Sequence, residues 1–188
     1  MTVYHLKELI KVPLFLSMLL VLIIFSLGCS QDRYQNGVYI NEKYDFNLTI
    51  PENWRPVSEE EAKQSPMLRS LSVLDNHLIV TPSDPDNTGL IFSVMPMTEE
   101  QFLAMPWNQY KRTLRSIGNM VIEDDTEEHI GGFDVHWVSG NAAQYHNGIV
   151  LFISNGKIMQ IFYWAQKPVE EEIFADIESI VLSLQKTS

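Results

Sequence analysis

The sequence predicts one α+β domain, a largely antiparallel β-sheet flanked by helices on both faces, preceded by a signal peptide. Residues 45–50 alternate between polar and apolar side chains, as an amphipathic strand does. An Asn-Gly pair separates two apolar runs, which is typical of a β-hairpin. Residues 169–184 carry an apolar stripe at helical spacing. With 188 residues, 45% of them hydrophobic, the chain has enough apolar surface for one core.

The N-terminal segment has the layout of a secretory signal peptide. Lys7 and Lys11 precede an uncharged apolar run from Val12 to Leu27. As a helix this run would span about 24 Å, whereas the hydrocarbon core of a membrane is about 30 Å thick. We therefore predict a lipoprotein signal peptide over residues 1–28, with an uncleaved transmembrane anchor, a plain signal peptide or a buried thiol as the alternatives.

Cys29 is the only cysteine, so an intramolecular disulfide and a cysteine-based zinc site are excluded. The stretch Ser26-Leu27-Gly28-Cys29 resembles the signal box of bacterial lipoproteins. It departs from the usual box at Ser26, where Leu is preferred, and at Leu27, where a small residue is commoner. The resemblance implies that the Cys29 thiol becomes the lipid attachment point. Two or more acyl chains, such as palmitate, would anchor the protein firmly, since one chain alone binds only marginally.

Residues 29–36 are predicted as a polar tether and residues 37–188 as the single α+β domain. The expected location is extracytoplasmic, on a membrane through the lipid anchor. If the host has two membranes, Ser30 favours the outer one, because the residue known for inner-membrane retention at that position is Asp.

The chain is acidic, with a net charge of −11. Without Lys7, Glu8 and Lys11, residues 29–188 keep 11 of the 13 basic and 23 of the 24 acidic side chains, a net charge of −12. Such a surface repels phosphate backbones and anionic lipid headgroups, so we expect no nucleic-acid partner.

The first half of the domain predicts strands and a short helix. The alternating strand over residues 45–50 places three apolar side chains on one face: Phe46, Leu48 and Ile50. Ser58 and Glu61 form a capping box that opens a helix. Strands are predicted over residues 77–81 and 90–95, separated by a turn-rich stretch.

The second half adds another capping box, Thr98 to Gln101, whose helix is interrupted near Pro106 and then resumes. Strands are predicted over residues 120–123 and 133–138, with Gly131-Gly132 as the turn before the second.

Asn155-Gly156 joins the predicted strands 149–153 and 158–165, which are apolar on both faces and need cover on each side. The terminal helix is expected to carry Pro168 in its first turn and glutamates beside it. Its apolar stripe comprises Val169, Ile173, Ile177, Ile180 and Leu184.

Four features of the sequence resemble the Mog1/PsbP-like α/β/α sandwich. They are a Pro-x-x-Trp after a strand (Ile50-Pro51-Glu52-Asn53-Trp54), the Gly-Gly turn, the apolar hairpin and a helix ending in Ile-Val-Leu-Ser-Leu. That superfamily includes a photosystem II extrinsic subunit, a nuclear-transport factor that binds a small GTPase, and many bacterial lipoproteins. The resemblance, over about residues 37–186, implies a binding or assembly module more often than an enzyme. No functional residue carries over, because no binding motif of the family stands at matching positions.

No catalytic constellation is visible, so we expect no enzyme activity and no cofactor. The sequence lacks a Gly-x-Ser-x-Gly elbow. Four histidines of the domain are scattered singly: His77, His129, His136 and His146.

Three stretches have residue types that bind metals, and each has a simpler structural interpretation. Residues 84–89 resemble the opening of an EF-hand loop, but the twelfth position would be Met95, and an Asp/Pro/Asn/Gly turn explains them. The acidic run 123–129 fits a solvated loop. Met97 and Met105, with Met95, resemble copper-binding methionines but also suit gap filling in a core. We predict no metal site.

Trp107, directly after Pro106 at the helix interruption, is the best candidate for a partly exposed aromatic residue on a partner-binding surface. The leading hypothesis is therefore a lipid-anchored, extracytoplasmic, non-enzymatic module that binds a protein partner or supports envelope assembly. The alternative is a small-molecule or metal-binding domain, with or without hydrolytic activity, which would require a cleft that gathers His136, His146 and acidic side chains. A purely structural envelope protein is a third possibility.

Overall fold

The computed structural model describes residues 33–71 and 75–187, so the predicted signal peptide, Cys29 and the start of the tether lie outside the described residues. Two antiparallel sheets form the fold: a four-stranded sheet in the order β1-β2-β3-β11 and a seven-stranded sheet in the order β4-β5-β6-β10-β9-β8-β7. The strands are β1 Arg33–Gln35, β2 Val38–Asn41, β3 Phe46–Thr49, β4 Arg55–Pro56, β5 Asp75–Thr81, β6 Thr88–Thr98, β7 Val121–Ile130, β8 Phe133–Ala142, β9 Tyr145–Ser154, β10 Lys157–Gln166 and β11 Gln185–Lys186.

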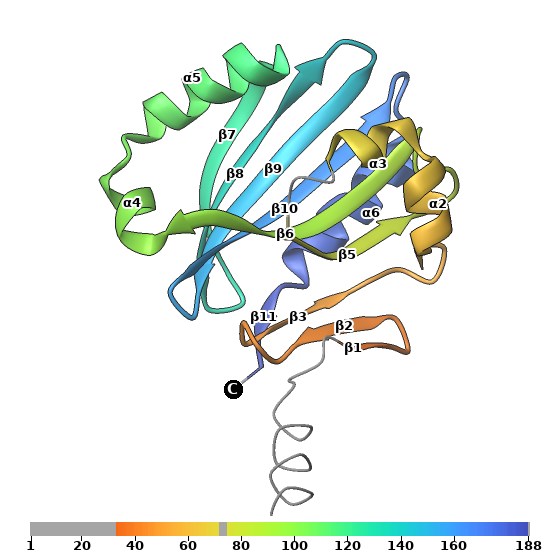
Figure 1. The fold of residues 1–188 in the computed structure, drawn as a ribbon, viewed down its shortest axis with the longest axis horizontal. Coiled ribbons are helices and arrows are strands. Elements are labelled where there is room, and N and C mark those ends of the chain that lie inside the picture. The colour runs from red at the N-terminus through yellow and green to blue at the C-terminus, as the bar shows by residue number, and fades with distance from the viewer. Residues whose placement is uncertain (1–32, 72–74, 188) are drawn as a thin grey trace, which may run out of the picture. The chain divides into compact units, whose positions relative to one another are not determined.

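Helices cover both faces of the seven-stranded sheet. They are α2 Glu59–Gln64, α3 Pro66–Ser70, α4 Glu99–Ala104, α5 Trp107–Gly118 and α6 Glu171–Leu182. In Figure 1, α6 lies behind this sheet and α2 and α3 lie in front of it, while α5 lies over β7 and β8. The predicted α+β class, with a largely antiparallel sheet between helices, is confirmed.

The main core fills the space between one face of the seven-stranded sheet, α6 and the four-stranded sheet. Phe46 of the small sheet packs on Phe92 of β6, with ring centroids 4.5 Å apart. From α6, Ile177, Ile180 and Val181 are buried in the same cluster. The opposite face carries two smaller clusters, one beneath α4 and α5 and one beneath α2 and α3.

Local sequence patterns predict several elements correctly. The alternating strand is β3, and its apolar side chains are buried. Both capping boxes form, at Ser58 and at Thr98. Asn155 and Gly156 have φ values of 47° and 68°, as a tight hairpin turn requires. The helix interruption at Pro106 separates α4 from α5.

The structure corrects three expectations. Residues 123–129 belong to β7 and not to a loop, because pairing with β8 satisfies their backbone while the charged side chains stay exposed at the sheet edge. Pro168 precedes α6 and is not in its first turn: Glu170, with φ −71° and ψ 142°, is the N-cap. The segment expected as a tether ends in strand β1, which pairs with β2.

Within the described part of the chain, none of the helices is long and apolar enough to cross a membrane.

Candidate functional site

The junction between α4 and α5 positions Trp107 at the surface. Thr98 and Gln101 cap α4, which ends at Ala104, and Met105 then has an extended backbone with φ −83° and ψ 122°. A residue before proline avoids the helical conformation, and Pro106 therefore separates the two helices. Trp107 begins α5 and is half-buried, as its predicted partial exposure requires.

The Trp107 ring is held on three sides. It stacks on Tyr110, one helical turn later, with centroids 5.1 Å apart and an interplanar angle of 14°. It also contacts the imidazole of His136 on β8, 4.6 Å between centroids. The indole Nε1 donates a hydrogen bond of 2.9 Å to Oδ1 of Asp125 on β7. These contacts fix the ring between α5 and the sheet.

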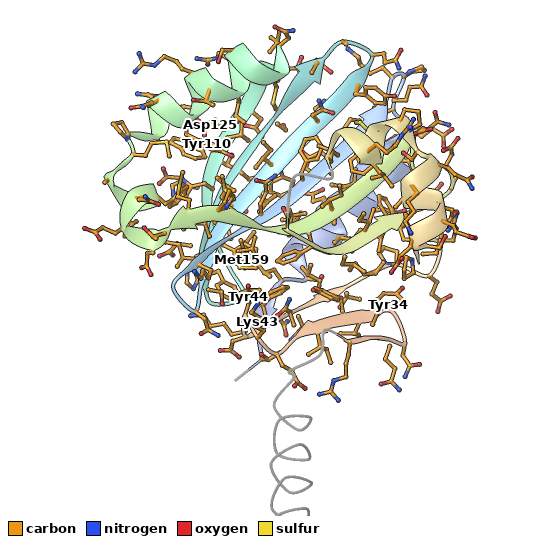
Figure 2. The ribbon with its side chains drawn as sticks, viewed as in Figure 1. Tyr34, Lys43, Tyr44, Tyr110, Asp125 and Met159 are labelled. Atoms are coloured by element: carbon orange, nitrogen blue, oxygen red, sulfur yellow. The ribbon has the colours of Figure 1, made fainter. Side chains whose placement is uncertain are left out.

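Asp125 ties α5 to the edge of the sheet. Its second carboxylate oxygen accepts a hydrogen bond from Lys111 Nζ, so one carboxylate holds two side chains of the helix. Burial opposes ionisation of this group, but the hydrogen bonds from Lys111 and Trp107 outweigh it and lower the pKa of Asp125. Figure 2 labels Asp125 and the buried Tyr110 beneath α5; burial raises the pKa of Tyr110.

His136 projects from β8 toward α4 and α5. Its ring lies edge-on to Phe102 of α4, with centroids 6.1 Å apart. The Nδ1 atom is buried and has no hydrogen-bond partner within residues 33–71 and 75–187. The nearest carboxylate oxygen, Oε1 of Glu127, lies 3.4 Å away. A buried polar atom that makes no hydrogen bond within the protein can form one with a bound molecule.

Two adjoining cavities open beside these residues. The smaller, of about 170 Å³, is lined by Phe102, Leu103, Met105, Trp107, Tyr110 and His136. The larger, of about 520 Å³, shares Phe102, Leu103 and His136 with it. We call the two together the Trp107 groove. Leu103 at its rim is 67% exposed, so this apolar side chain is open to a partner.

The rest of the larger cavity mixes apolar walls with charged side chains. Its remaining lining residues are Glu99, Glu127, Gly132, Phe133, Asp134, Phe152, Ile153 and Lys186. The groove is therefore apolar at its floor and mainly acidic at its rim.

The cleft required by the alternative hypothesis forms only in part: His136 shares the larger cavity with Glu127 and Asp134, but His146 does not line it. On β8, His136 is paired with Leu151, and His146 on β9 is paired with Asn141. Because strand residues alternate between faces, the two imidazoles lie on opposite sides of the sheet. His146 lies 3.9 Å from Glu123 and packs on Phe174, and burial lowers its pKa, partly offset by Glu123.

The other polar candidates serve the fold. The Oδ1 atom of Asp86 accepts hydrogen bonds from Ser65 Oγ and from the backbone N–H of Met67 at the start of α3. His129 contacts Asp134 at the exposed hairpin, and the side chain of His77 lies outside the described part of the structure. The described residues contain no group of three or more His, Cys, Asp or Glu that could hold a metal ion.

The methionines fill space in the apolar cluster beneath α4 and α5. Met95, Met97 and Met105 all pack against this cluster, which agrees with the gap-filling interpretation.

Sequence reasoning selected Trp107 but missed its neighbours. Phe102 and Leu103 follow the Thr98 capping box closely, so the helix start could have indicated that they flank Trp107. His136 was named only for the alternative cleft with His146, because only the pairing of β7, β8 and β9 brings it beneath α5.

Comparison with known proteins supports the fold. No model of a known family matches the sequence, and no curated protein matches it. Among solved structures, the cyanobacterial PsbP protein CyanoP of Synechocystis sp. PCC 6803 is similar with a TM-score of 0.56 at 10% identity, over 85% of this chain and 94% of that chain. LpqN, involved in cell envelope biogenesis of Mycobacterium tuberculosis, is similar with a TM-score of 0.50 at 14% identity, over 76% and 83%.

The chain therefore has a PsbP-like α+β sandwich fold, as its resemblance to the Mog1/PsbP-like sandwich implied. At these identities the likeness establishes the fold, and a fold by itself does not define a function.

Proposed function

We propose that this protein is a lipid-anchored, extracytoplasmic, non-enzymatic module that binds a protein partner, or supports envelope assembly, through the Trp107 groove. The observation that carries the proposal is the exposed Leu103 beside a half-buried Trp107 and two cavities. Aromatic residues with apolar neighbours in a partly desolvated pocket are the usual anchors of protein interfaces.

Two further observations support a binding module. The described part of the chain places His136 and His146 on opposite sheet faces, so the two imidazoles do not share one site. LpqN, of similar fold, is involved in cell envelope biogenesis, which is consistent with an envelope role.

The anchor is tested by labelling cells with an alkyne fatty acid. We expect the full chain to be labelled and to sediment with membranes, and the Cys29→Ser variant to be unlabelled, because the thiol is the attachment point in the proposed lipoprotein. Equal labelling of the two proteins would contradict lipid attachment at Cys29. It would not bear on the Trp107 groove, which has a separate test.

The partner site is tested by photo-crosslinking the full chain in the cells that produce it. A benzophenone amino acid replaces Leu103 or, as the matched control, Leu182 of α6, which is also exposed, at 49%. We expect a discrete protein adduct at position 103 and none at position 182. Indistinguishable adduct patterns at the two positions would overturn the proposed binding site.

A further inference from the structure

We propose that the Trp107 groove accepts an extended peptide segment of its partner in which an apolar side chain is flanked by lysine or arginine. This inference rests on the proposed function and specifies the chemistry of what the groove binds.

The apolar part of the argument comes from the shape of the groove. Phe102 and His136 belong to both cavities, so the cavities adjoin along one line between α4 and β8. Leu103 stands exposed at this line, with Trp107 at one end. Burying these side chains against an apolar residue of the partner removes them from water, which is the main source of affinity at such sites.

The backbone of the bound segment has one candidate hydrogen-bond partner in the groove, the imidazole of His136. His136 Nδ1 is buried beneath the groove, makes no hydrogen bond among the described residues and lies 3.4 Å from Oε1 of Glu127. A main-chain amide or carbonyl entering the groove can pair with this nitrogen, depending on its tautomer. An extended segment presents such groups along its whole length, whereas a helix has already paired them.

The charge of the segment follows from the rim. Three carboxylates line the larger cavity: those of Glu99, Glu127 and Asp134. The side chains of Glu127 and Asp134 are 71% and 95% exposed, so they face whatever approaches. Lys186, the one cation in the lining, lies over the Phe133 ring at 5.1 Å. The rim therefore attracts a basic segment.

The same charges disfavour other occupants. A second copy of the chain carries a net charge of −11 and would bring like charges together. An anionic membrane surface would be repelled for the same reason. A peptide with an apolar residue between basic residues complements both the apolar floor and the acidic rim of the groove.

The test measures binding of fluorescent peptides to the detergent-solubilised full chain by anisotropy. The probe is a short peptide with a central leucine flanked by lysines; one control replaces leucine by serine and the other replaces the lysines by glutamates. We expect saturable binding of the probe and about tenfold or weaker affinity for each control. Raising the salt from about 0.05 M to about 0.5 M should weaken binding of the probe.

Two pairs of variants locate the binding. We expect Leu103→Ala and Glu127→Lys each to weaken probe binding by about tenfold. Leu182→Ala and Glu178→Lys, matched exposed changes on α6, should leave it unchanged. Equal effects of the groove variants and their controls would overturn the proposal.

The crosslinking experiment separates the two proposals. An adduct at position 103 whose partner peptide contains an apolar residue among lysines or arginines supports the inference. Three other adducts would overturn the inference of a basic segment: one to a segment without basic residues, one to a lipid and one to a second copy of this chain. Of these, only the adduct to a protein segment without basic residues is compatible with the proposed function. If position 103 gives no more protein adduct than position 182, both the proposed binding site and the inference of a basic segment are overturned.

Discussion

At the scale of single residues, Asp125 links two elements of the candidate site, α5 and β7. One oxygen accepts from the Trp107 indole on α5 and the other from Lys111, while the residue itself belongs to β7. A charged acceptor with two donors, partly shielded from water, stabilises more than an exposed ion pair does. The orientation of Trp107 therefore depends on an ionised carboxylate beneath it.

We expect Asp125→Asn to lower the free energy of unfolding by about 1–2 kcal/mol at about pH 7. Because folding lowers the pKa of Asp125, its stabilising effect is present above the unfolded pKa of about 3.9 and is lost as the pH falls through the folded value. The difference between wild type and variant should therefore shrink toward about pH 3. Urea unfolding measured across this range by tryptophan fluorescence checks it.

The control for that measurement is Asp134→Asn, at a side chain that is 95% exposed and pairs with the surface residue His129. Its effect on stability should be small at every pH. A difference between wild type and Asp125→Asn that stays constant with pH would show that shape, and not charge, accounts for the role of Asp125.

At the scale of elements, β7 is an acidic edge strand. It pairs with β8 alone in the sheet order and presents carboxylates along its length: Glu123, Asp124, Asp125, Glu127 and Glu128. An unpaired strand edge invites pairing with another chain, and repeated like charges oppose that pairing between copies. The same charges leave a basic segment as the favoured neighbour of this edge and of the groove beside it.

Replacing two of these carboxylates should increase self-association. We expect Asp124→Thr with Glu128→Thr to form dimers or larger species at protein concentrations where the wild type is monodisperse, because the edge loses repulsion and gains strand propensity. Sedimentation velocity measures the effect. The control, Glu59→Gln with Glu60→Gln, removes the same charge from α2; equal self-association in the control would assign the effect to net charge.

At the scale of the whole domain, the C-terminal segment joins the two sheets. After α6, Ser183 Oγ accepts a hydrogen bond of 2.8 Å from the Thr49 backbone, and Leu184 is fully buried in the main core. The Lys186 N–H then donates to the Gly131 carbonyl in the β7–β8 turn. Gly131 has no space for a side chain, since a Cβ would lie 1.7 Å from the Leu184 oxygen.

Two nearby leucines test this connection. We expect Leu184→Ala to destabilise the domain by about 2–5 kcal/mol, because it leaves a cavity where the sheets meet. Leu182→Ala, at a side chain that is 49% exposed, should change stability by less than about 0.5 kcal/mol. Thermal and urea unfolding of the two variants give the comparison; equal losses would mean that Leu184 is not part of the cooperative core.

The class of the fold and several of its elements follow from local patterns in the chain. The alternation in β3, the capping boxes at Ser58 and Thr98, and the Asn155-Gly156 turn depend on residues that are neighbours in the chain. Their geometry is fixed by local sterics and hydrogen bonds, which short patterns record. Trp107 was found in the same way, through the helix break at Pro106.

The surroundings of Trp107 depend on contacts between residues that are far apart in the chain. Three features depend on the pairing of β7, β8 and β9: the contact of Trp107 with His136, its hydrogen bond to Asp125, and the placement of 123–129 at a sheet edge. A shift of that pairing by one residue would send His136 to the other face. No short pattern in the sequence records a register that is set by side chains packing across the whole sheet.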